Sequence, residues 1–371
     1  MAARAILTQV MRRRLIFAAL AIAVLSGVAL ALPRVSHHLP HSLETVAHLP
    51  ERLVARVLPP SVPKGERLAG LTGPERETVD ALAQRLGGLV VWSSNRTGNH
   101  ELYLLDLSTR SVRRLTNTPH VEFFSRFSPD GRRIVFTRSQ REYVSPRDPT
   151  AWDVYVMNAD GTGDRLLARN GYSPQWTPDG AAIIFLRGAQ VIRLEVKGGT
   201  PGRESVLLDG PTTEGIQGGM ETPELSPDGT RLAVTVRSRR YGGVAVVDLG
   251  TRAVTPLSPG NACQITWIPG DSARLLWMES VGNGGTSIMA GGPGLPRAMF
   301  MDLPGAYSHE YFPRVSGDGR WLVWGAAAQG HEHDRADYEI FAWQIGQPVS
   351  DVVRLTHHPG NDQWPDIRLT R

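Results

Sequence analysis

The sequence contains a single cysteine, Cys263, among its 371 residues, so an intramolecular disulfide bond is excluded. A zinc site built on a Cys-x-x-Cys pair is excluded for the same reason. The formal net charge is only +4, and four arginines within the first fourteen residues, where no acid occurs, account for it. The remaining chain is close to neutral and has no basic stripe interleaved with aromatic residues, so a nucleic-acid partner is not predicted.

Motifs for common enzyme chemistry are also scarce. Serines such as Ser226 and Ser316 belong to repeated turns and lack the pattern of a nucleophile elbow. The glycine-rich stretch AGGPGLP (290–296) lacks the strand-to-helix context of a phosphate-binding loop. These absences favour a binding or scaffold protein over an enzyme.

One long apolar run is present, at residues 15–32 (LIFAALAIAVLSGVALAL), and it carries no charge. A spanning helix needs roughly 20 apolar residues, within a range of about 17–25. Because the arginine cluster precedes the run, we expect residues 1–14 to be a basic cytoplasmic tail and everything after Pro33 to lie outside the cytoplasm. The run is either a retained signal-anchor in the inner membrane or a signal peptide cleaved after Ala29–Ala31.

Residues 33–86 form a spacer that prolines interrupt repeatedly. Within it, TGPERETVDALAQRL from Thr72 predicts a short helix, with Pro74 in its first turn and acids early. The spacer is either a solvated stalk or carries a helix that packs on the following domain.

A sequence repeat extends over residues 87–371. Its unit has a strand ending in an apolar residue, a tight turn that is usually Pro-Asp-Gly, an apolar strand, a third strand and a short edge strand. A period of about 40–50 residues with four strands per unit predicts an all-β propeller, here with six blades. The apolar residues before the turns recur every 42 to 52 positions and are Phe127, Trp176, Leu225, Trp267, Val315 and Ile367.

The two ends of the repeat predict how the ring closes. The first strand pattern, LVVWSS from Leu89, has no turn strand before it, and the last segment, NDQWPDIRLT from Asn361, has nothing after it. We therefore expect the C-terminal strand to be the innermost strand of the first blade, which leaves no open edge between the ends.

Two segments, SNRTGNHELYLLDLSTRSVRRLTNTPHVEFFSRFSPDG (94–131) and WDVYVMNADGTGDRLLARNGYSPQWTPDG (152–180), resemble the repeats of TolB-like six-bladed propellers. The resemblance implies the fold, and more loosely a role as scaffold, ligand binder or accessory domain. TolB has an α/β domain before its propeller, whereas only the spacer 33–86 stands there in this sequence. The resemblance therefore does not imply the Tol–Pal partnership.

Acidic and histidine side chains gather at the connectors between blades. Three acids occupy the same repeat position on the neighbouring blades two, six and one, so we expect one arc at a channel mouth. Oxygen and imidazole groups of this kind suit a divalent cation, Ca²⁺ or Mn²⁺. Alternatively, the acids cap backbone groups or pair with Arg126 or Arg314. The ligand or metal candidates are Glu122, His309, Glu310, His331, His333 and Asp362.

The sequence thus predicts an extracytoplasmic propeller, tethered by one helix, that binds an envelope protein or polysaccharide. It is a single-pass inner-membrane protein, or is secreted after signal cleavage. The alternative is a metal-dependent carbohydrate-active enzyme, because oligogalacturonate-lyase-type propellers use a histidine-rich metal site that this histidine face loosely resembles.

Overall fold

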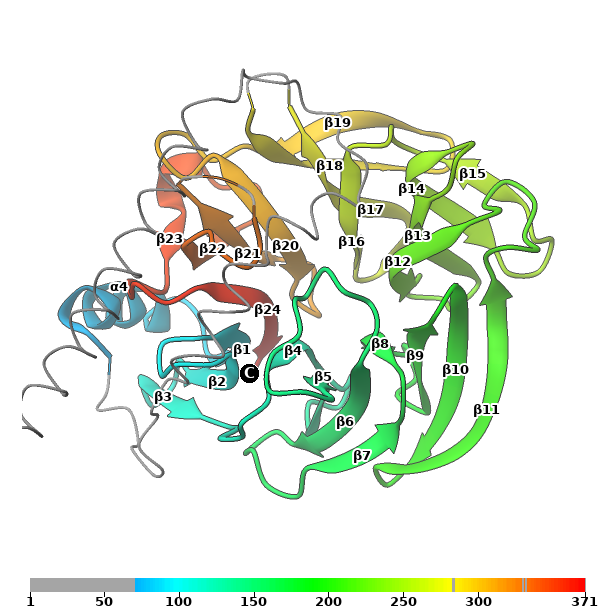
Figure 1. Cartoon of the computed structure of the whole chain (residues 1–371). Coiled ribbons are helices and arrows are strands. Elements are labelled where there is room, and N and C mark those ends of the chain that lie inside the picture. Colours follow the sequence, from blue (N-terminus) through cyan, green and yellow to red (C-terminus); the bar gives the residue numbers. More distant parts are fainter. Residues whose placement is uncertain (1–70, 282–283, 329, 331, 371) are drawn as a thin grey trace, which may run out of the picture. The chain divides into compact units, whose positions relative to one another are not determined.

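The computed structural model describes residues 71–281, 284–328, 330 and 332–370. The chain divides at Pro60 into two units, and the described residues belong to the second. They form one α-helix, a short 3-10 helix and six four-stranded antiparallel sheets arranged around a centre (Figure 1). Within these residues, no helix has the length and apolar character needed to cross a membrane. The apolar run at 15–32 lies outside them, so its role stays a prediction.

The predicted six blades are confirmed, because the strands form six sheets. Each sheet has four strands, which are given below in order from the innermost to the outermost. Blade one consists of β24 (Asp362–Leu369), β1 (Gly88–Ser94), β2 (Glu101–Asp106) and β3 (Ser111–Arg114). Blade two consists of β4 (Glu122–Phe127), β5 (Arg133–Ser139), β6 (Trp152–Asn158) and β7 (Arg165–Ala168). Blade three consists of β8 (Tyr172–Trp176), β9 (Ala182–Arg187), β10 (Gln190–Lys197) and β11 (Thr200–Asp209).

The other three blades follow the same plan. Blade four consists of β12 (Gly219–Leu225), β13 (Arg231–Arg237), β14 (Gly242–Asp248) and β15 (Val254–Pro256). Blade five consists of β16 (Ala262–Ile268), β17 (Asp271–Ser280), β18 (Thr286–Gly292) and β19 (Leu295–Met301). Blade six consists of β20 (His309–Val315), β21 (Trp321–Ala327), β22 (Tyr338–Gln344) and β23 (Val353–Arg354), with the 3-10 helix η1 (Val349–Asp351) before its last strand.

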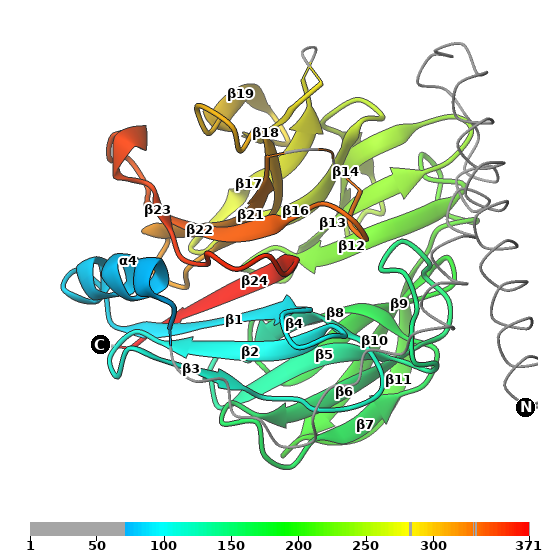
Figure 2. The ribbon, with the colours of Figure 1, turned by 60° about the vertical axis from the view of Figure 1, so that its left-hand side comes forward.

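Closure by the C-terminal strand is also confirmed. β24 pairs antiparallel with β1, from Gly88 opposite Leu369 to Ser94 opposite Asp362. The first and last described strands therefore lie in one sheet, although the whole propeller sequence separates them (Figure 2). Pairing of the chain ends removes the open edge that each would otherwise present.

Apolar side chains of adjacent blades pack against each other face to face. One buried cluster joins Val91 and Leu104 of blade one to Phe136 of blade two, and another joins Trp277 of blade five to Val246 of blade four. Strands buried on both faces carry nearly continuous apolar runs rather than alternation. The repeated aromatic and aliphatic residues are thus mainly the packing between blades.

Helix α4 (Gly73–Ala83) packs on the ring, whereas residues 33–70 of the predicted spacer lie outside the described residues. Thr72 caps its N-terminus in a reciprocal pair with Glu75, which satisfies two backbone donors. Val79 and Leu82 are buried in the cluster shared by blades one and six. The helix lies beside β23 (Figure 2), so it covers the seam at which the ring closes.

The Asp-Gly turns are built as the sequence indicates. In the first, the Ser128 hydroxyl donates to Asp130 over 2.6 Å and accepts from the Arg133 backbone N–H at 3.0 Å. Gly131 has φ of 61°, which glycine adopts without steric cost. Blade five keeps a tight turn with a different sequence, since only Pro269 and Gly270 separate its first two strands.

Candidate functional site

A β-bulge interrupts the innermost strand of every blade. Each bulge holds one non-glycine residue in the left-handed region, with φ between 45° and 59°. Such residues are uncommon, and a six-fold recurrence marks a built feature of the ring. The six bulge residues, which line the centre of the ring or pack beside it, are Phe124, Ser173, Thr222, Gln264, Phe312 and Trp364.

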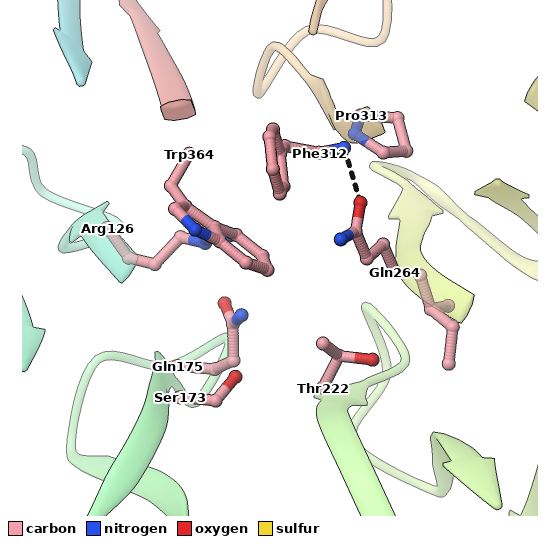
Figure 3. Close-up of a pocket in the computed structure, with 9 residues that line it drawn as sticks. Arg126, Ser173, Gln175, Thr222, Gln264, Phe312, Pro313 and Trp364 are labelled. Carbon is pink, nitrogen blue, oxygen red and sulfur yellow. Dashed lines mark hydrogen bonds between the residues drawn. The ribbon is translucent and has the colours of Figure 1, made fainter. Parts of the chain in front are cut away.

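The bulge residues divide the centre of the ring into two halves. Blades one, two and six contribute aromatic rings: the Trp364 ring centroid lies 3.9 Å from that of Phe124 and 4.2 Å from that of Phe312. Blades three, four and five contribute the small or polar Ser173 and Thr222, together with Gln264. Figure 3 shows Trp364 and Phe312 facing these polar side chains across a small central space.

On four of the innermost strands, a charged residue follows the bulge residue by two positions. Arg314 is ion-paired with Glu224, and its Nε lies 3.5 Å from an Asp366 oxygen. Asp366 also accepts a hydrogen bond from the Phe127 backbone N–H. Arg126 lines the same space but makes no ion pair among the described residues.

The three predicted acids are fully buried and have separate partners, so they do not form an open arc at a channel mouth. Glu122 accepts from Arg138 Nε at 2.7 Å and from the Thr118 hydroxyl at 2.8 Å. Thr118 follows the last strand of blade one, whereas Glu122 begins blade two. This carboxylate therefore ties two neighbouring blades together.

Asp362 makes a comparable connection at the closure of the ring. It pairs with Arg96 Nη2 at 2.8 Å, and Arg96 Nη1 also lies 3.6 Å from a Glu75 oxygen. The sequence analysis offered pairing with arginine as an alternative to metal binding, and Glu122 and Asp362 do pair with arginines. It named the wrong arginines, because Arg126 and Arg314 lie deeper in the ring.

Glu310 differs from the other two acids, because no arginine pairs with it among the described residues. One oxygen accepts from the Leu303 backbone N–H at 2.6 Å, and the other has no hydrogen-bond partner. Burial, with a smaller contribution from nearby Asp302, raises the pKa of Glu310 to about 8. The side chain is therefore mainly neutral at pH 7.

The histidine candidates lie in different surroundings. His309 is half-buried, with Nδ1 3.5 Å from the Ser308 hydroxyl. The His333 ring packs edge-on against Tyr311 and Phe312, with both centroid distances 5.1 Å. His331 lies outside the described residues. Within the part of the chain that is described, no three His, Cys, Asp or Glu side chains gather as metal ligands. Cation binding at these candidates stays a prediction.

The connectors between blades and the loops between the second and third strands of each blade lie on one face of the ring, here called the connector face. Sequence reasoning missed a contact between two long loops on this face. Tyr143 Oη and Ser145 Oγ, from the loop between β5 and β6, donate to the two carboxylate oxygens of Asp334 at 2.8 and 2.7 Å. Asp334 lies in the loop between β21 and β22, so blades two and six meet across blade one. Figure 1 shows the β5–β6 loop extending over the centre of the ring. We call Tyr143, Ser145 and Asp334 the clasp.

The clasp rests on buried anchors. Val144, between its two donors, is buried in the central apolar cluster. On the other side, the His333 carbonyl accepts from the Asn361 side-chain amide at 2.6 Å. The Tyr143 side chain remains 43% exposed. Loop length was the available signal, because residues 140–151 and 328–337 are longer than the corresponding blade-one loop, 95–100.

Comparison with curated proteins finds relatives that each match part of the chain. A TolB homologue of Chlorobium luteolum is 31% identical over 171 residues, which cover 44% of this chain and 35% of that protein. An uncharacterised protein of Agrobacterium fabrum is 30% identical over 108 residues, which cover 27% of this chain and 36% of that protein. The chain thus covers about a third of the length of these relatives. No family model matches it.

Solved structures give the same architecture. A putative TolB from Agrobacterium tumefaciens superposes with a TM-score of 0.52 and 16% identity, covering 77% of this chain and 99% of that one. At this identity the likeness concerns the fold alone. The repeat and the six closed blades show a six-bladed β-propeller, and the comparisons show that it is similar to TolB homologues.

Proposed function

We propose that the chain is an extracytoplasmic binding scaffold that docks a protein of the cell envelope on its connector face. Residues 15–32 hold it in the inner membrane, with residues 1–14 in the cytoplasm. The apolar run and the arginines before it support this orientation. The TolB-like fold supports a binding role by analogy.

The observation that carries the proposal is the clasp. Two long loops are hydrogen-bonded to each other and anchored in a rigid ring, so the surface they form is ordered before any partner arrives. Preorganisation lowers the entropy cost of association. Tyr143, which is partly exposed there, is of a residue type enriched in binding hot spots.

Site-specific photo-crosslinking in envelope-competent cells tests the proposal. A photoreactive phenylalanine analogue at Glu142, an exposed residue next to the clasp, should capture a specific envelope protein. The same analogue at Arg132, exposed in an Asp-Gly turn at the opposite end of β5, should not.

A variant separates docking from proximity. Asp334→Ala removes both hydrogen bonds between the loops without touching the buried blade contacts. It should therefore strongly reduce capture at position 142, while expression and melting temperature stay close to wild type. Equal capture from both faces, or capture that Asp334→Ala leaves unchanged, would contradict docking at the clasp.

The metal-dependent carbohydrate-active enzyme has no specific observation in its favour. Two of the three candidate acids already have arginine partners, and the third is held neutral by burial. Polysaccharide as the partner likewise stays a prediction.

A further inference from the structure

Two glutamates meet at the seam between blades one and two. Glu101 begins β2 and Glu122 begins β4, and both are fully buried. Thr118 joins them, because its backbone N–H donates to Glu101 Oε1 at 2.9 Å and its hydroxyl donates to Glu122 Oε1 at 2.8 Å. The two carboxyl groups are also in hydrogen-bonding contact with each other. Two carboxylates in such contact repel each other unless one of them is neutralised.

The arginines at this seam are fewer than the carboxyl groups. Arg114 Nη2 donates to Glu101 at 2.7 Å, and Arg138 Nε donates to Glu122 at 2.7 Å. Arg138 Nη1 also pairs with Asp164 at 2.8 Å, so two arginines face three carboxyl groups. Asp164 is 45% exposed, whereas both glutamates are shielded from solvent. The local charge therefore balances when the glutamate pair carries one proton.

One oxygen of the pair still lacks a donor. Glu101 Oε2 is buried and accepts no hydrogen bond from the described residues. Burial and, next, the Glu101 carboxyl group raise the pKa of Glu122 well above its ordinary value, although Arg138 opposes this. A shared proton supplies a donor to the pair and removes one of the two like charges.

Other titratable groups around the pair do not change this balance. His100, whose backbone carbonyl accepts from the Glu122 N–H, is neutral because burial lowers its pKa to about 3. Burial raises the pKa of Tyr103, which lies near Glu101, so the phenol is also neutral. His120 lies in the same connector as Thr118, and its titration is common to wild type and to the variants below.

The seam between blades six and one repeats the construction. Glu339 there is bonded to Arg354 and to the Thr356 hydroxyl, and Asp362 is its neighbouring acid. Asp362 Oδ1, like Glu101 Oε2, has no hydrogen-bond partner among the described residues. Burial raises the pKa of Glu339 to about 8, and Asp362 adds to this, although the Thr356 hydroxyl opposes it. Recurrence at two seams indicates a built feature of the ring.

We propose that Glu101 and Glu122 form a proton-binding site that holds one shared proton at pH 7 and fastens blade one to blade two. An arginine already donates to each carboxyl group, so a proton rather than a metal cation is the missing positive charge. Release of this proton leaves two adjacent negative charges in a buried seam, so the seam weakens as the pH rises. The proposal does not rest on docking at the clasp.

The pH dependence of unfolding tests the proposal. A proton that is held when folded and released on unfolding makes stability fall as the pH rises above 4.5, the ordinary glutamate value. Glu101→Gln keeps a hydrogen-bond donor toward Glu122 but binds no proton. In denaturant melts between pH 5 and 7, the unfolding equilibrium constant of wild type should therefore rise about tenfold more per pH unit than that of the variant.

Glu195→Gln is the matched control, because this glutamate is 54% exposed and pairs with Arg193 at 3.5 Å. It should keep the wild-type pH dependence, whereas equal pH dependence in wild type and Glu101→Gln would overturn the proposal. If Glu101→Gln does not fold, infrared spectra at pH 7 decide, with labelled glutamate in a Glu310→Gln and Glu339→Gln double variant. A remaining band of a protonated glutamate supports the shared proton, and loss of every such band refutes it.

Discussion

Arg96 lies where helix α4, blade one and the closing strand meet. Its side chain is 4% exposed, and its two carboxylate partners, Glu75 and Asp362, are 3% and 0% exposed. The Arg96 guanidinium also lies over the Trp92 ring, 5.3 Å from the centroid. One arginine thus pairs with two buried acids from elements far apart in the sequence.

Arg96→Met should lower the free energy of unfolding by about 3–5 kcal/mol, because it leaves two buried carboxylates without their cation. Arg110→Ala is the matched control. Its ion pair with Asp80 also joins blade one to α4, but the two side chains are 52% and 46% exposed. It should cost at most about 1 kcal/mol. Equal losses in chemical denaturation would show that burial of the Arg96 pair is unimportant.

Glu310 gives a prediction about pH. Its folded pKa is about 8 against an ordinary value of 4.5, so the carboxyl ionises first in the unfolded state. The stability that the neutral carboxyl group contributes is fully present below about pH 4.5. It falls as the pH rises and is lost once the pH passes about 8. Glu310→Gln stays neutral, so at pH 8 it should be more stable than wild type by up to a few kcal/mol, with no such gain at pH 4.

Glu204→Gln should show the opposite sign. An exposed ion pair with Arg187 lowers the pKa of Glu204, so that carboxylate contributes a little stability at neutral pH and loses it in acid. Denaturant melts at pH 4, 6 and 8 compare the two variants. A Glu310→Gln effect that is independent of pH would contradict a neutral Glu310.

These side-chain roles could be predicted only in part. The repeat position of Glu122 and Asp362 was visible, and so was the general choice between arginine and metal. The identity of Arg96 and Arg138 was not, because each pairing depends on how a loop or strand of one blade meets the next. The left-handed bulge residues were also hidden, since phenylalanine, serine, threonine, glutamine and tryptophan share no property that requires positive φ.

At the scale of elements, the closing strand is the most consequential. β24 supplies Trp364 to the central cluster and Ile367 to the cluster under α4. The sequence predicted this strand from an orphan pattern at each end, and the repeat period predicted the six blades. The sequence left open whether the helix from Thr72 packs on the propeller. A short amphipathic helix can belong to a solvated stalk or can cover the contact between two blades.

Removal of residues 361–371 should abolish cooperative folding or lower the melting temperature strongly, because it opens the ring and exposes the edge of β1. A chain that lacks only Arg371 is the control and should melt as wild type does. Addition of a peptide of residues 361–370 should restore part of the lost stability. A truncated chain with the wild-type melting temperature would refute the role of β24 in closure.

For the molecule as a whole, the arginine-rich start and the apolar run predict the side of the membrane on which the propeller lies. A reporter enzyme that is active only outside the cytoplasm, fused after Arg371, should be active. Replacement of Arg12, Arg13 and Arg14 by glutamate should reduce that activity, because the positive charges orient the helix. An inactive reporter in a well-expressed wild-type fusion would overturn the orientation.

We expect the ring to be stable without a divalent cation at Glu122, Glu310 and Asp362, because its own side chains balance or avoid the charge of these buried acids. Calorimetry of the full chain with Ca²⁺, Mn²⁺ or a chelator tests this most directly. We predict the same melting temperature in all three conditions, because Arg138 and Arg96 supply the positive charge and Glu310 is neutral. A saturable rise with either cation that is lost in Glu310→Ala and Asp362→Ala would contradict the account and restore the metal-dependent enzyme.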